Sequence, residues 1–262
     1  MKSIFLILLS IFQGICFAST DYEIKRFIVI SIDALHPDSI KIVNPKNIGK
    51  LMTKGVFDLN GKSVTPPKTL VSHTAMFTGL KPEDSGLKSN VWKKGDKKVD
   101  KNTVFNDLKR HGFKTYYIYS KEKLGFLEND AVDSAIFGKD DSVYIAEDIL
   151  RNNKDKFFMF LHISGLDFAG AKYGWLSNEY LEEFKYIDED LKFIIDTAIK
   201  DPDTAIIITS DHAGHERIHG SLHEEDMKLL LIVLEKNKKI SEKDIENYES
   251  YKLRSLINKI LE

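Results

Sequence analysis

The sequence has little of what marks the specialised classes of protein. Its 262 residues include a single cysteine, Cys16, with only 6 prolines and 15 glycines. One cysteine excludes a disulfide-stapled scaffold, and so little proline and glycine excludes collagen-like and low-complexity chains. Basic charge is not in excess either, because 38 Lys and Arg face 40 Asp and Glu. We therefore expect no binding of duplex nucleic acid, and the 42% hydrophobic content predicts an ordinary globular core.

One apolar run stands out, and it lies at the N-terminus. Lys2 precedes an apolar stretch over residues 4–12, and Cys16 and Ala18 follow as small residues. This pattern predicts a signal peptide over residues 1–18 that is cleaved after Ala18. A membrane anchor is the alternative, but polar residues interrupt the run, which falls short of the roughly 20 apolar residues that a span needs. We expect an exported protein, periplasmic or secreted, with no stable membrane span after cleavage.

Strand-like and helix-like segments alternate along the rest of the chain. Continuous runs of apolar, largely β-branched residues predict strands buried on both faces. These runs are residues 26–32, 115–119, 157–162, 204–210 and 229–234. Apolar residues at three- and four-residue spacings predict helices over 48–54, 103–111, 143–152 and 178–200. The alternation predicts one domain over residues 19–262, of the α/β class, with three αβα layers and a largely parallel central sheet.

Acidic residues and a histidine follow several of the predicted strands. Asp33 follows the first, Asp167 comes after the run at 157–162, and Asp211 and His212 follow the run at 204–210. Ligands of such sheets bind at the carboxyl ends of the strands, where these side chains meet. A single aspartate at a strand end is most often a turn residue. Three carboxylates with a histidine instead indicate a metal site for zinc, with manganese as the alternative.

Histidines cluster directly after the last of these aspartates. Four of the 8 histidines lie within a dozen residues, at His212, His215, His219 and His223. A core histidine normally occurs alone, so the cluster favours metal binding over packing.

Thr69 stands where a helix can begin, after two prolines and before Gly79. It is either a plain N-cap or a nucleophile, because a helix N-terminus favours negative charge and offers amide groups to a phosphate.

Taken together, these segments resemble the alkaline phosphatase superfamily, and in particular its type I phosphodiesterase/nucleotide pyrophosphatase family. The matching segments occur in the family's order, and they are Ser31-Ile32-Asp33, Lys68-Thr69-Leu70-Val71-Ser72-His73, Thr78-Gly79-Leu80-Lys81-Pro82-Glu83, Asn90, Asp167 with Gly170 and Lys172-Tyr173-Gly174, Ser210-Asp211-His212, and His219-Gly220. The resemblance implies one metal ion held by Asp33, Thr69, Asp211 and His212. It implies a second held by Asp167, a histidine four residues later, and His219.

The resemblance also implies an activity. Thr69 would be the nucleophile of a metal-dependent phosphoric ester hydrolase, passing through a phosphothreonine, with one or two zinc ions as cofactors. Asn90 would donate a hydrogen bond to a phosphate oxygen, and Tyr173 is a candidate substrate-binding residue. The substrate would be small and phosphorylated, with diesters and nucleotide pyrophosphates ahead of monoesters.

One departure from the family pattern bears on the second metal. Ala171 stands where the family has a zinc-binding histidine, and a methyl group cannot coordinate a metal. Three outcomes stay open: His215 or His223 substitutes as a ligand, the enzyme works with one metal, or the chain is a catalytically impaired relative that binds phosphorylated ligands without turnover.

Overall fold

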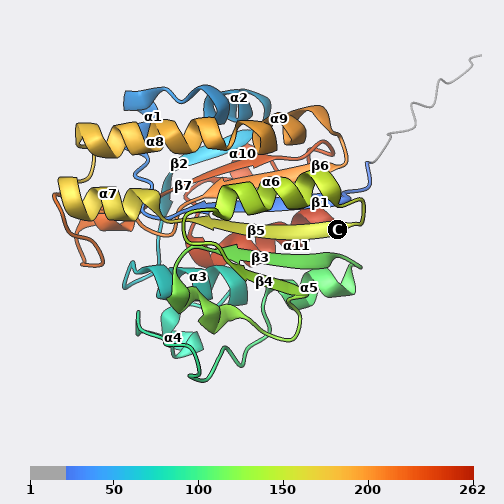
Figure 1. Cartoon of the computed structure of the whole chain (residues 1–262), viewed down its shortest axis with the longest axis horizontal. Helices are drawn as coiled ribbons and strands as arrows, with labels where there is room; N and C mark the ends of the chain where they lie inside the picture. The colour runs from blue at the N-terminus through green and yellow to red at the C-terminus, as the bar shows by residue number, and fades with distance from the viewer. Residues whose placement is uncertain (1–21) are drawn as a thin grey trace, which may run out of the picture.

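The computed structural model describes residues 22–262, which form an α/β fold of three layers (Figure 1). The predicted signal peptide, residues 1–18 with Cys16, lies outside the described residues. Within the part of the chain that the structure describes, no helix is long and apolar enough to cross a membrane.

The central layer is a seven-stranded mixed sheet. Its strands are β1 (Arg26–Ile32), β2 (Val56–Lys62), β3 (Lys114–Tyr119), β4 (Ser134–Phe137), β5 (Phe157–Ile163), β6 (Thr204–Thr209) and β7 (Lys228–Leu234). They lie in the order β2-β7-β6-β1-β5-β3-β4. The pairs from β6 through β4 are parallel, and β7 runs antiparallel to both β6 and β2. The sheet is therefore largely parallel, as predicted.

The register of the central strands sets where the chain leaves the sheet. Ser31 of β1 pairs with His162 of β5 on one side and with Thr209 of β6 on the other. The three strands therefore end at the same level, and the residues that follow them share one edge. This edge is the carboxyl end of the parallel strands, where such folds bind their ligands.

Helices cover both faces because the strands are apolar on both. Ile28 and Ile30 of β1 belong to one core cluster, and Phe27 and Val29 belong to the other. The first cluster packs under α1 (Asp38–Val43), α2 (Lys46–Lys54), α6 (Ser142–Asn152), α7 (Gly165–Tyr173), α8 (Asn178–Asp190) and α9 (Lys192–Lys200). The second packs under α3 (Thr69–Thr78), α5 (Val104–Arg110), α10 (Glu242–Ile245) and α11 (Leu253–Leu261). The predicted αβα architecture is confirmed.

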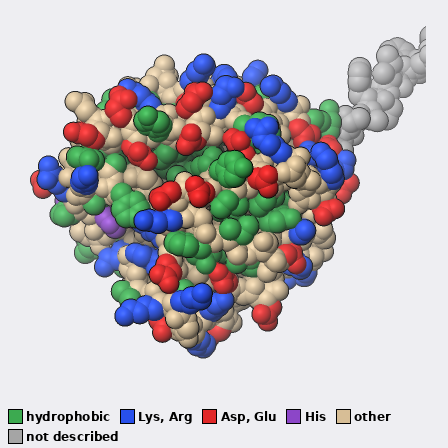
Figure 2. Space-filling model, viewed as in Figure 1, with side chains coloured by type: hydrophobic (Ala, Val, Ile, Leu, Met, Phe, Trp, Pro, Cys, Tyr) green, Lys and Arg blue, Asp and Glu red, His purple; other side chains and the backbone are tan. Residues whose placement is uncertain are grey.

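Short elements complete the chain between these layers. They are α4 (Pro82–Ser85) and three 3₁₀ turns, η1 (Glu122–Leu127), η2 (Glu224–Met227) and η3 (Ser250–Lys252). On the face shown in Figure 2, acidic and basic side chains intermingle, in keeping with their near-equal numbers.

The structure differs from the sequence-based expectation in several elements, and α1 and α7 are helices that were not predicted. The edge strands β2 and β4 were not predicted, because an edge strand buries less and needs no continuous apolar run. The helix expected over 178–200 is two helices that meet at Leu191. The apolar residues of α8 and α9 keep the same spacing across Leu191, because both helices pack on the same core cluster. Hydrophobic periodicity alone therefore does not show that one helix ends there and another begins.

Candidate active site

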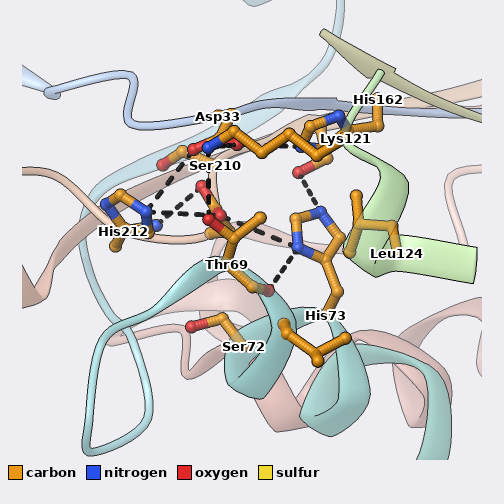
Figure 3. A network of polar contacts seen from close by, with 12 residues as sticks. Asp33, Thr69, Ser72, His73, Lys121, Leu124, His162, Ser210 and His212 are labelled. Carbon is orange, nitrogen blue, oxygen red and sulfur yellow. Dashed lines mark hydrogen bonds and ion pairs between the residues drawn. The ribbon is translucent and has the colours of Figure 1, made fainter. Parts of the chain in front are cut away.

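Three potential metal ligands meet at the carboxyl edge of the sheet. Asp33 directly follows β1, whereas Asp211 and His212 come just after β6, and all three side chains are fully buried. Figure 3 shows Asp33 and His212 side by side. His212 Nε2 lies 3.4 Å from Asp33 Oδ1 and 3.5 Å from Asp211 Oδ2. One atom from each residue thus lies within 4.8 Å of the others. We call Asp33, Asp211 and His212 the buried group.

The facing atoms of the buried group have no hydrogen-bond partner within residues 22–262: Asp33 Oδ1, Asp211 Oδ2 and His212 Nε2. Buried polar atoms normally have partners, because leaving one unpaired costs on the order of 1–3 kcal/mol. His212 Nδ1 donates to the carbonyl of Ala213 at 2.9 Å, which leaves Nε2 as the ligand atom, the arrangement typical of a metal-bound histidine. The donor set and its unpaired atoms fit a divalent cation such as zinc.

The electrostatics of the buried group also favour a cation. Burial and the neighbouring charge of Asp33 raise the pKa of Asp211. Burial opposes ionisation of Asp33 as well, but Lys121 and His162 outweigh it and hold the pKa of Asp33 well below its usual range. Burial would lower the pKa of His212, yet the carboxylates of Asp211 and Asp33 raise it. The group therefore attracts positive charge.

Thr69 is the first residue of α3 and is fully buried at this edge. In Figure 3 its side chain lies below Lys121, between His212 and His73. Asn90 holds the start of the helix, because its Oδ1 accepts a hydrogen bond of 2.9 Å from the amide of Leu70. That bond uses the side-chain oxygen of Asn90 and leaves its N–H donors available.

His73 stabilises the same turn of α3 through two hydrogen bonds. Its Nδ1 donates to the carbonyl of Thr69 at 2.8 Å, and its Nε2 accepts from the Ser31 hydroxyl at 2.9 Å. Burial and the nearby His162 lower the pKa of His73 to about 3, so its ring is neutral and keeps both hydrogen bonds. The sequence analysis did not single out this residue.

Asp167 and His219 form a second, more open group with His212. Asp167 lies in the first turn of α7, and its Oδ1 is 3.3 Å from His219 Nε2. The rings of His212 and His219 stack with their centroids 4.3 Å apart. Ala171 lies one turn after Asp167 on α7 and is exposed, so it leaves this group one ligand short. We call Asp167 and His219 the open group.

Lys121, which the sequence analysis missed, lies between the two groups. It follows β3 by two residues, and its Nζ is 2.5 Å from Asp33 Oδ2, 2.6 Å from Asp167 Oδ2 and 3.3 Å from Thr69 Oγ1. Burial would lower the pKa of Lys121, but Asp33 and Asp167 raise it, so the side chain is an ammonium. Its place after a strand end does not by itself distinguish Lys121 from other lysines of the sequence.

His162, at the end of β5, contacts the buried group. Its Nε2 donates to Asp33 Oδ2 at 3.0 Å, and the Ser120 hydroxyl lies 2.8 Å from its Nδ1.

The remaining candidates lie apart from the two groups. His215 donates through Nδ1 to Asp226 Oδ1 at 2.7 Å, and its ring stacks on His223 at 3.8 Å. These three residues form a cluster of their own, separate from the one that contains Asp167. Tyr173 ends α7 and is 41% exposed, with the Lys172 ammonium 4.8 Å from its ring centroid.

The fold and site define the class of protein, an alkaline phosphatase-like enzyme fold. The sequence model of the family described as type I phosphodiesterase / nucleotide pyrophosphatase matches residues 27–124 and 127–231. The chain belongs to this family, and the predicted resemblance is confirmed.

Solved structures share the fold at low sequence identity. Murine ectonucleotide pyrophosphatase / phosphodiesterase 5, in an inactive form in complex with AMP, superimposes with a TM-score of 0.74 at 13% identity, covering 92% of this chain and 95% of that one. The C-terminal periplasmic domain of EptC from Escherichia coli, in complex with Zn, gives a TM-score of 0.67 at 12% identity, covering 93% and 84%.

Curated relatives with detectable sequence similarity include transferases. GPI ethanolamine phosphate transferase 1 of Yarrowia lipolytica is 28% identical over 219 residues, which are 70% of this chain and 22% of that protein. The protein of the same name from Emericella nidulans is 27% identical over 225 residues, 75% of this chain and 24% of the relative. The chain spans about a quarter of the length of these relatives.

Proposed function

We propose that this chain cleaves phosphodiesters by transferring the phosphoryl group to Thr69 and then to an acceptor. The observation that carries the proposal is the position of the Thr69 hydroxyl, at the N-terminus of α3 and 3.3 Å from the Lys121 ammonium, which also contacts Asp33 of the buried group. In that position a developing negative charge meets amide groups of the helix, an ammonium and a site for a cation.

Different residues of this chain have different roles in the proposed reaction. The Thr69 oxygen bonds to phosphorus while the bond to the leaving alcohol oxygen breaks; the hydroxyl proton passes to solvent and the leaving oxygen takes one up. Asn90 donates to an oxygen of the transferring group, from the side chain that already holds the Leu70 amide. Asp33, Asp211 and His212 would hold a zinc or manganese ion, which supplies Lewis acidity for the charged oxygens when bound.

The acceptor in the second step is water or an alcohol. Water makes the chain a phosphodiesterase, in line with the family description. An alcohol acceptor is the second candidate, and the similarity to GPI ethanolamine phosphate transferases favours it. We further propose that the reaction takes place after export, on the basis of the N-terminal pattern in residues 1–18.

Trapping the covalent intermediate tests this proposal. The purified protein is incubated with bis(p-nitrophenyl) phosphate, quenched in acid and digested, and the peptide containing Thr69 is examined by mass spectrometry. We expect Thr69 to carry a p-nitrophenyl phosphoryl group, because only one p-nitrophenol leaves when the threonine oxygen bonds to phosphorus. Turnover should fall by about 10³-fold or more in Thr69→Ala, because the nucleophile is lost. Thr69→Ser keeps a hydroxyl and retains activity. Binding of the diester with no p-nitrophenol release by the metal-loaded wild type would instead identify a non-catalytic binding protein.

A matched control and an acceptor series complete the test. Thr74, on the same helix, bonds its hydroxyl to the Leu70 carbonyl at 2.7 Å, and Thr74→Ala should keep its turnover because that hydroxyl faces the helix backbone. Adding glycerol separates the two acceptors: a transferase forms the glycerol diester, and a hydrolase releases only p-nitrophenyl phosphate.

A further inference from the structure

The open group lacks the ligands that a second metal ion needs. Zinc in proteins normally takes about four ligands, three of them from protein even in a catalytic site. Asp167 and His219 each offer one atom, and His212 Nε2 is the third atom within reach. That same nitrogen faces Asp33 and Asp211 in the buried group, and one lone pair binds one ion. With His212 committed there, the open group keeps two ligands, because Ala171 supplies none.

Lys121 fills the space between the groups with a positive charge. Its ammonium contacts one oxygen of Asp33 and one of Asp167 at 2.5 and 2.6 Å, and those carboxylates come from opposite sides of the site, after β1 and in α7. The opposite oxygens, Asp33 Oδ1 and Asp167 Oδ1, stay without a hydrogen-bond partner among the described residues. One oxygen of Asp33 thus faces the Lys121 ammonium, and the other faces the rest of the buried group, Asp211 and His212.

The charges of the site balance with one ion rather than two. Asp33, Asp167 and Asp211 carry three negative charges, and the ammonium of Lys121 with one divalent cation supplies three positive charges. A second divalent ion would leave an excess of two positive charges and would lie beside an ammonium that is only 10% exposed. Buried like charges at such range repel strongly.

We propose that the Lys121 ammonium takes the place of the second metal ion, so that this chain binds one divalent cation and uses Lys121 as its second positive charge. The proposal rests on the proposed function for what the charge does. The ammonium lies 3.3 Å from Thr69 Oγ1, where it stabilises negative charge on the attacking oxygen and on the transferring phosphoryl group. Lys121 is then a catalytic residue, and the loss of the histidine at position 171 is compensated from a neighbouring strand end.

Metal stoichiometry tests the proposal without using activity. The full chain is dialysed against trace zinc and then against metal-free buffer, and bound zinc is measured by elemental analysis. We expect one ion per chain in the wild type and in Ala171→His, because the ammonium remains. We expect two ions in the double variant Lys121→Met/Ala171→His, which removes the charge and restores the ligand. Lys123→Met/Ala171→His is the matched control and should keep one ion, since Lys123 makes no ion pair with the aspartates of the site.

The outcomes separate this proposal from the proposed function. Two ions in the wild type or in Ala171→His would overturn the role of Lys121 and leave the function intact, whereas no ion in the wild type would overturn the buried group as a metal site and with it both proposals. A natively folded double variant that stays at one ion would also overturn the role of Lys121. The wild type and Ala171→His decide the matter even if the double variant fails to fold, because position 171 is exposed. In Lys121→Met alone we expect turnover to fall on the order of 10²-fold with one ion still bound.

Discussion

The buried group and the open group differ in what holds their ligands. Asp33, Asp211 and His212 follow two adjacent parallel strands and are fully buried, so the register of β1 and β6 fixes their spacing. The side chains of Asp167 and His219 come from a helix and a loop, and they are 13% and 24% exposed. A ligand set fixed by sheet register is complete here, and the set carried by α7 and the loop has lost a member. The sheet therefore fixes the geometry of the buried group, whereas the positive charge next to the open group can be supplied by a different cation.

Replacing one histidine in each group should give the largest difference between the two groups in ion binding and turnover. We expect His212→Ala to lose the bound ion and to lower turnover by about 10³-fold or more, because three buried unpaired ligand atoms would be reduced to two carboxylate oxygens. His219→Ala should keep the ion, and its turnover should fall by about 10-fold to 100-fold. Elemental analysis and diester turnover of both variants measure the difference, and equal loss of the ion in both would show that the two groups hold one shared cation.

Packing against Trp175 supports the open group, and a glycine exchange tests it. Trp175 is buried beside His219, with ring centroids 5.7 Å apart, and a Cβ at Gly214 would lie 2.5 Å from the indole ring. Gly214→Ala should therefore cost about 1–3 kcal/mol of unfolding free energy, because the ring must shift. Gly49→Ala is the control, since its Cβ would meet nothing within 4 Å in α2 and alanine favours a helix. Urea denaturation of both variants compares them, and an equal stability would contradict the tight fit.

The two histidines should also differ in how they hold a proton. Burial would lower the pKa of His212, but Asp211 and Asp33 raise it above its ordinary value of 6.5, whereas burial and His212 lower the pKa of His219. In the metal-free protein the contribution of His212 to stability is fully present below its ordinary pKa and is lost as the pH rises through its raised pKa. Zinc must displace that proton, so its affinity should rise about tenfold per pH unit from 6.5 up to the raised pKa.

Calorimetry in two buffers of different ionisation enthalpy measures the proton released on zinc binding. We expect the release at pH 6.5 in the wild type and in His219→Ala, because the raised pKa of His212 keeps its ring largely protonated there. Zinc binding without proton release would contradict the assignment of the bound proton to His212.

Much of the fold was accessible from sequence because the central strands are buried on both faces. The run at residues 26–32 coincides with β1, and its alternating residues fill both core clusters. The edge strands and the break at Leu191 were missed, since neither changes the apolar pattern.

The site was predictable where a residue's place follows from a strand end. Asp33, Asp211 and His212 were expected together on that ground, and the structure brings them together. Lys121 also follows a strand, but a lysine at a strand end has no distinctive pattern, and its contact with Asp167 depends on how α7 lies over the edge. Long-range pairing of this kind is set by tertiary packing and has no local signal.

The smallest effect expected concerns His215 and His223, the residues considered as substitutes for the missing ligand. His215 already donates to Asp226, a buried carboxylate whose other oxygen accepts from Ser221. Its stacking partner His223 accepts from the Glu225 amide at 3.3 Å through Nδ1. Because these contacts form a cluster separate from the buried group and the open group, the double variant His215→Ala/His223→Ala should keep one zinc per chain and change turnover by less than about twofold. Elemental analysis beside wild type checks this. If less zinc is bound by the double variant, the loop with His215 and His223 must move to supply a ligand to the open group. The open group would then differ from the buried group in having a ligand on a movable loop.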